Sequence, residues 1–136
     1  MRYCRRAGTF ATTFGPIDHV ESHIENWLWI EAKIRGSFGL RGIGLDKVFD
    51  VKRKSLMAKH FEAAGVGYPS SKTVTSETDC YEFMEKRRAN EFVIKPDIGV
   101  VMAHTSVIRS FDDISTFFAR SPSDISYIIQ ERAADP

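Results

Sequence analysis

The stretch that decides the fold is EFVIKPDIGVVMAHTSVIRSF, from Glu91 to Phe111. An apolar triplet runs into Lys95, a segment with a proline, an aspartate and Gly99 follows, and a second apolar run covers residues 106–108. Apolar, β-prone runs that are bounded by Pro, Asp and Gly are typical of strands joined by a loop. We therefore predict an antiparallel strand–loop–strand unit in which Lys95 ends the first strand.

Two interpretations of Lys95 stay open on the residues alone. In the first, the strand fixes the lysine stem and the amides of the glycine-bearing loop surround phosphate oxygens. In the second, Lys95 is an ordinary strand-end lysine whose ammonium group reaches out to water. The sequence has no GxxxxGK[ST] motif, so this loop is not a P-loop.

Periodicity and capping residues divide the rest of the chain. Apolar residues at three- and four-residue steps predict a helix over 24–34, after a short strand over 16–23, with Ser22 as the N-cap. A second helix is expected over 46–64, with a break near Val51 and an end at Gly65. The remaining elements are a strand over 71–75, a helix capped by Ser76, a helix capped by Ser110 and a strand over 127–130.

Composition narrows the class of protein. The chain has 136 residues, 43% hydrophobic and 27% charged, which predicts one domain of ordinary globular character. A net charge of +1 argues against nucleic acid and anionic membranes as partners. No apolar run approaches the roughly 20 residues of a membrane span. Cys4 and Cys80 are too few for a disulfide framework, so we expect a cytoplasmic protein. The first 15 residues resemble a transit peptide, but an untethered N-terminus is the simpler expectation.

Motifs for metals and for nucleophilic catalysis are weak. The four histidines share no ligand spacing with cysteines or carboxylates, and no GxSxG motif is present. Asp112 and Asp113 begin a predicted helix, where carboxylates stabilise the positive end of the helix dipole. The basic run over 52–54 is typical of a solvated helix face. We therefore predict no metal-ligating residue.

Two motifs taken together point to a family. KSLMAKHFEAAGVGYP begins at Lys54, and FVIKPDIGV begins at Phe92. With the element order around them, they resemble the ATP-grasp superfamily, nearest to its carboxylate–amine ligases and carbamoyl-phosphate-synthase-like members. The resemblance runs from Lys54 to Glu131. Residues 15–40 resemble, less specifically, the last strand–helix unit of the domain that precedes the ATP-grasp fold in those enzymes.

The resemblance implies an α/β fold in two parts. Residues 1–44 would be the tail of a Rossmann-like pre-ATP-grasp domain. Residues 45–136 would be the linker and the smaller, nucleotide-covering lobe of the ATP-grasp fold, truncated at the hinge. In this family the second lobe follows the hinge and holds magnesium, so we expect this chain to lack the magnesium ligands.

The resemblance also implies a site and a reaction. Lys54 would reach the nucleotide phosphates, Lys95 would contact the α- and β-phosphates, and the loop from Gly99 to Thr105 would cover them. The hinge would meet the adenine, with Gln130 and Glu131 beside it. The implied cofactor is ATP, the implied substrate is a small carboxylate activated as an acyl-phosphate, and an amine would then attack it.

Two further expectations concern the chain as a whole. Val101 and Met102 replace small residues of the covering loop, and Arg132 replaces an apolar hinge residue, so a non-catalytic remnant that serves binding or assembly is the alternative. We do not expect ligase activity from this chain alone. Without the second lobe, the apolar runs over 92–94 and 127–129 are expected to lie exposed and to favour a homo-oligomer.

Overall fold

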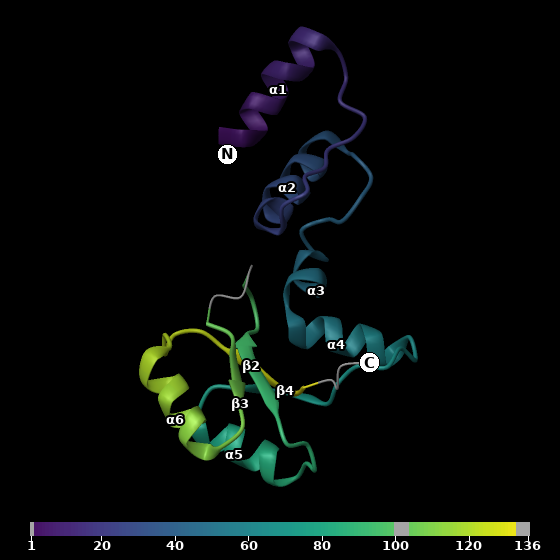
Figure 1. Cartoon of the computed structure of the whole chain (residues 1–136). Coiled ribbons are helices and arrows are strands. Elements are labelled where there is room, and N and C mark those ends of the chain that lie inside the picture. Colours follow the sequence, from purple (N-terminus) through teal and green to yellow (C-terminus); the bar gives the residue numbers. More distant parts are fainter. Residues whose placement is uncertain (1, 100–103, 133–136) are drawn as a thin grey trace. The chain divides into compact units, whose positions relative to one another are not determined.

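The computed structural model describes residues 2–99 and 104–132 (Figure 1). The chain forms two compact units that divide between Lys52 and Arg53. This division lies further along the chain than the boundary expected after Gly44, which concerned domains of a larger fold and stays a prediction. The two units are described separately below.

The first unit is helical. It contains α1 (Arg2–Phe14), the 3₁₀-helix η1 (Glu25–Trp27), α2 (Leu28–Phe38) and α3 (Val48–Lys52). The expectation of an untethered N-terminus is wrong, because α1 is a helix whose Tyr3 ring stands edge-on to Trp27, with centroids 5.5 Å apart. Helix α2 ends at Gly39, whose φ of 63° is the left-handed conformation that glycine adopts without strain.

The strand expected over 16–23 is absent, and a buried ion pair explains why. Arg35 donates from Nε and Nη2 to the Val20 carbonyl, at 3.1 and 2.6 Å, and pairs with Glu31 at 3.0 Å. Ser22 donates its hydroxyl to Glu31 instead of capping a helix. The segment therefore binds the side chains of α2, and the Rossmann-like character expected for residues 1–44 is not confirmed.

The second unit is a four-stranded antiparallel sheet with helices. Its elements are α4 (Lys54–Ala63), β1 (Ser71–Val74), α5 (Glu77–Glu85), β2 (Phe92–Pro96), β3 (Ser106–Ile108), α6 (Phe111–Arg120) and β4 (Tyr127–Glu131). The strand order is β1-β4-β2-β3. The predicted pairing of the Lys95 strand is confirmed, since Val93 lies opposite Val107 in an antiparallel ladder. The predicted caps Ser76 and Ser110 are also confirmed, each accepting a backbone hydrogen bond in the first turn.

Successive side chains along each strand point to opposite faces of the sheet. Ile94, Ile129 and their neighbours point towards α5 and α6, where they form the core with Cys80 and Phe117. Figure 1 shows α5 and α6 together on this side. The opposite face, here called the lysine face, carries Val93, Lys95, Ile128 and Gln130.

The expected apolar exposure is wrong. Phe92, Ile94 and the run Tyr127–Ile129 are all buried within the single chain, none of them more than 2% exposed. Helices α5 and α6 already cover most of these side chains, so this apolar surface gives no argument for a homo-oligomer.

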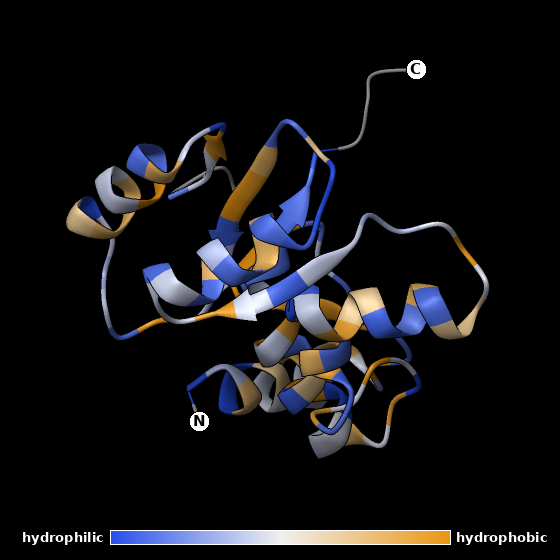
Figure 2. Cartoon of the chain, turned by 90° about the horizontal axis from the view of Figure 1, so that it is seen from below, coloured by the Kyte–Doolittle hydropathy of each residue, from blue (hydrophilic) through white to orange (hydrophobic). Residues whose placement is uncertain are grey.

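Hydropathy is divided between the faces of the helices. Figure 2 shows hydrophilic and hydrophobic bands alternating along them. Among the described residues, no helix combines the length and the apolar character that crossing a bilayer requires.

Candidate functional site

Lys95 lies on the lysine face near the end of β2, between the buried residues Ile94 and Pro96. Its side chain is partly buried. Burial, and then the positive charge of Lys54, lower the pKa of Lys95 below its usual 10.5. The folded chain therefore holds this ammonium group in surroundings that disfavour its charge.

Lys54 is the first residue of α4 and comes to the same place from another part of the chain. Its backbone N–H donates to the carbonyl of Asp97 at 3.0 Å, and its Nζ donates to the carbonyl of Gly99 at 3.3 Å. The helix start is thus joined to the segment that follows β2. Two of the predicted site residues, Lys54 and Gly99, are in direct contact.

The two lysines together form a positively charged site. In the part of the chain that the structure describes, neither Lys54 nor Lys95 forms an ion pair with a carboxylate. The carboxylate nearest to Lys95 in sequence, Asp97, is paired with Arg53. Two neighbouring ammonium groups repel, so their arrangement favours an anion between them.

The two hinge residues lie on opposite faces of β4. Gln130 lies opposite Val93, on the lysine face, and its Oε1 is buried without a hydrogen bond from any described residue. A buried acceptor without a donor among the described residues is uncommon. The Glu131 carboxylate, by contrast, pairs with Arg87 at 3.4 Å. The structure therefore brings Gln130, but not the Glu131 side chain, to the face that carries Lys95.

The covering loop is described only at its ends. Gly99 accepts the bond from Lys54, and Thr105 directly precedes β3. The predictions about Val101 and Met102 lie outside the described residues. Among the described residues, no group of three His, Cys, Asp or Glu side chains could hold a metal ion.

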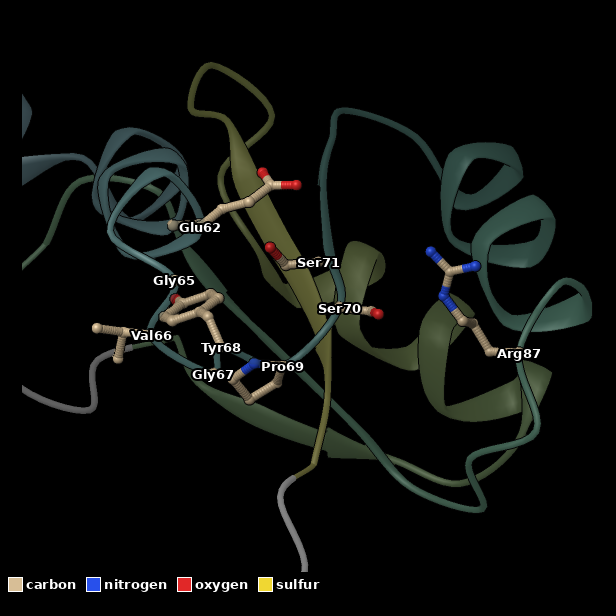
Figure 3. Close-up of a pocket in the computed structure, with 10 residues that line it drawn as sticks. Glu62, Gly65, Val66, Gly67, Tyr68, Pro69, Ser70, Ser71 and Arg87 are labelled. Atoms are coloured by element: carbon tan, nitrogen blue, oxygen red, sulfur yellow. The ribbon is translucent and has the colours of Figure 1, made fainter.

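A groove that the sequence reasoning missed borders the hinge. It has a volume of about 430 Å³, and none of the six predicted site residues lines it. In Figure 3, Glu62 and Arg87 lie on opposite sides of Ser70 and Ser71. Ser70 accepts the backbone hydrogen bond of Glu131, so the groove adjoins the end of β4. The glycine- and proline-rich segment over 65–71 is the sequence feature that could have indicated this groove, but Gly65 was interpreted only as the end of a helix.

The fold is one that ATP-grasp ligases share. Solved structures with high similarity include the L-amino acid ligase from Bacillus licheniformis, with a TM-score of 0.65 over 95% of this chain at 13% identity. D-alanine–D-alanine ligase from Helicobacter pylori matches 75% of the chain, with a TM-score of 0.59 at 11% identity. D-alanyl-alanine synthetase A from Vibrio cholerae matches 76%, with a TM-score of 0.57 at 12% identity.

Because the sequence identities are low, these likenesses show a shared fold alone. The chain spans 29%, 32% and 33% of the length of the three ligases. No protein-family model matches the sequence, and no curated protein matches it. The resemblance drawn from the two lysine motifs is thus confirmed at the level of the fold.

Proposed function

We propose that this chain supplies the phosphate-binding and adenine-facing surface of an ATP site in a ligase of the ATP-grasp type. The observation that carries the proposal is the pair of lysines, Lys54 and Lys95, which share one place without a carboxylate partner among the described residues. The fold shared with ATP-grasp ligases supports the choice of nucleotide.

The phosphates would occupy the space between the two lysines. A phosphate group relieves their mutual repulsion and raises the lowered pKa of Lys95, because an adjacent negative charge favours the protonated amine. Lys95 supplies the more rigid contact, since β2 fixes its stem between buried residues. Gly99 and Thr105 would bring the two ends of the covering loop to the same phosphates.

The adenine would lie against the hinge. The side chain of Gln130 lies on the lysine face, and its Oε1, which has no donor among the described residues, would suit the exocyclic amino group of the base once the side chain turns outwards. Arg87 holds the carboxylate of Glu131. We therefore assign to Glu131 a contribution through its main chain and no contact between its side chain and the nucleotide.

The complete reaction requires more protein than this chain. An ATP-grasp ligase would activate a small carboxylate as an acyl-phosphate for attack by an amine. In that reaction Lys54 and Lys95 would neutralise phosphate charge as it shifts during transfer, with magnesium ligands supplied by a second lobe. For this chain alone we propose nucleotide binding without turnover.

Calorimetric titration with ATP, with and without magnesium, tests the proposal. Lys95→Ala should weaken binding about 10- to 100-fold, the range for losing a charged hydrogen bond, and Lys54→Ala should weaken it less. The matched control is Lys72→Ala, which removes a lysine from β1 that is already paired with Asp79 and Glu82. Equal ATP binding by the wild type and Lys95→Ala would overturn the phosphate-binding role of Lys95. Absence of ATP binding by the wild type would overturn the proposal and favour the alternative of a binding or assembly module that does not use nucleotide.

A further inference from the structure

We propose that Asp97 is a positioning residue that fixes Lys54 next to Lys95 by anchoring the first turn of α4 to the end of β2. Asp97 touches no nucleotide in this proposal and acts through the two lysines. The effect of Asp97 on ATP affinity rests on the function proposed above. The effect of Asp97 on the positions of Lys54 and Lys95 is independent of that function.

Asp97 is a buried carboxylate, 1% exposed, that forms hydrogen bonds with three residues in two other parts of the chain. Its Oδ1 accepts a hydrogen bond from the backbone N–H of Ser55 at 2.8 Å. Its carbonyl accepts from the N–H of Lys54 at 3.0 Å, and its own N–H donates to Ser126 before β4 at 3.0 Å. One residue therefore joins the start of α4 to the two central strands of the sheet.

Helix α4 depends on this distant carboxylate for its N-terminal cap. The residue at the cap position, Arg53, makes no capping hydrogen bond with its side chain. It is extended, with φ −89° and ψ 118°, and pairs with Ile98 in an isolated β-bridge. Asp97 supplies the missing acceptor from 42 residues further along the sequence. A carboxylate there also stabilises the positive end of the helix dipole.

The second carboxylate oxygen has a charged partner. Asp97 Oδ2 is buried without a hydrogen bond from the described residues and lies 3.6 Å from Nη1 of Arg53. A buried charge is unfavourable unless it is paired. A capping role alone would be met by a neutral acceptor such as asparagine, so the capping contact and the ion pair can be separated by substitution.

This anchor determines how close the two lysines are. Lys54 is the first residue of the anchored helix, and Lys95 precedes Asp97 by one proline on β2. Because the two ammonium groups repel, the helix start would move away from β2 if it were released. Asp97 therefore opposes this repulsion in the chain without ligand and keeps both cations in place for one anion.

The test compares Asp97→Ala with Asp97→Asn. Alanine removes the charge and the side-chain acceptor of Ser55 N–H, whereas asparagine removes the charge and keeps that acceptor. Both variants keep the main-chain bond from Lys54 N–H to the carbonyl of residue 97. The first readout is the titration of the Lys95 side chain by NMR, measured without nucleotide. We expect Asp97→Ala to raise the pKa of Lys95 towards its usual 10.5, because Lys54 moves away, and Asp97→Asn to leave it near the wild-type value.

The second readout is ATP affinity, with thermal unfolding as a measure of the whole fold. Asp97→Ala should weaken ATP binding about fivefold to tenfold, the equivalent of a lost helix cap, and Asp97→Asn should stay within about twofold. Asp113→Ala is the matched control, because Asp113 caps α6 by accepting from the N–H groups of Arg109 and Ser110. It should lower the unfolding temperature without changing the titration of Lys95.

The outcomes separate the two proposals. A titration of Lys95 in Asp97→Ala that matches the wild type, or an equal change in Asp113→Ala, overturns the role of Asp97. If the wild type binds no ATP, the proposed function fails, while the Lys95 titration still decides the positioning role. If Asp97→Ala does not fold, Asp97→Asn decides alone, and a change in ATP affinity well beyond twofold overturns the proposal.

Discussion

Two neighbouring residues of β2 should have opposite effects when each is replaced by alanine. Ile94 is fully buried against α5 and α6, whereas Lys95 lies on the lysine face. Ile94→Ala removes three carbons, about 2.4 kcal/mol of transfer free energy at 0.8 kcal/mol per carbon. The cavity left behind brings the loss to about 3–4 kcal/mol. Lys95→Ala should change the free energy of unfolding by less than about 1 kcal/mol.

The size of this loss decides the assay. A unit of the size of Arg53–Pro136 has a stability of about 4–12 kcal/mol, so Ile94→Ala removes a large part of it and still leaves a folded population at low temperature. Urea unfolding followed by circular dichroism gives the free energies, and calorimetry at 10 °C gives ATP binding. We expect Ile94→Ala to bind ATP once corrected for its folded fraction, and Lys95→Ala to be stable and to bind weakly. Equal stability losses for both variants would refute the assignment of the two faces.

Three further predictions follow from single side chains. The N–H of Thr75, and then the Lys72 ammonium group, lower the pKa of Asp79 to about 2, against a usual 3.8, although burial opposes this shift. The stability gained from Asp79 should therefore be complete above pH 3.8 and lost as the pH falls towards 2, and urea unfolding of Asp79→Asn should show a smaller loss over that range. Burial raises the pKa of the Cys80 thiol to about 12, so it should react with a thiol reagent at pH 8 only on unfolding, and rapid labelling of the native chain at Cys80 would contradict this. Gln130→Met should weaken ATP binding but not triphosphate binding, while Glu131→Gln should leave both unchanged, and calorimetry with the two ligands distinguishes the outcomes.

The sheet was predictable because its signals are local. Ser76 and Ser110 are N-caps followed by helical periodicity, and the runs around Lys95 and Val107 are bounded by turn residues. A break in the helix predicted over 46–64 was expected near Val51, and it lies at Arg53, between α3 and α4. These features depend on neighbours within a few residues, which a sequence displays directly.

The errors arose where distant contacts override local pattern. Residues 16–23 looked like a strand, but their partner is the Arg35 side chain of α2 and not another strand. Helix α1 was missed because its N-terminal arginines and threonines were read as a mobile end. The cap of α4 could not be predicted, because Asp97 lies 42 residues from Ser55 in sequence.

The hinge shows how one structural rule refines a resemblance. Gln130 and Glu131 are adjacent, and both were assigned to the nucleotide. Side chains alternate along a strand, so the two lie on opposite faces of the sheet. The pairing of Gln130 with Val93 puts Gln130 on the face that carries Lys95, and the ion pair with Arg87 holds the Glu131 side chain on the other face. The register of β4 therefore makes Gln130 the hinge side chain to test in the proposed site.

The lysine face carries a charge that lowers the stability of the unliganded fold, and this supports the proposed binding role. Burial and Lys54 both disfavour the charge of Lys95. An apolar residue in place of Lys95 would remove this penalty without disturbing the core around Ile94 and Ile129, which lies on the other face. Unfavourable groups held in place by a well-packed scaffold are typical of functional sites. An anion bound between the lysines would turn their repulsion into attraction, so the free energy that the unliganded fold gives up is regained on binding.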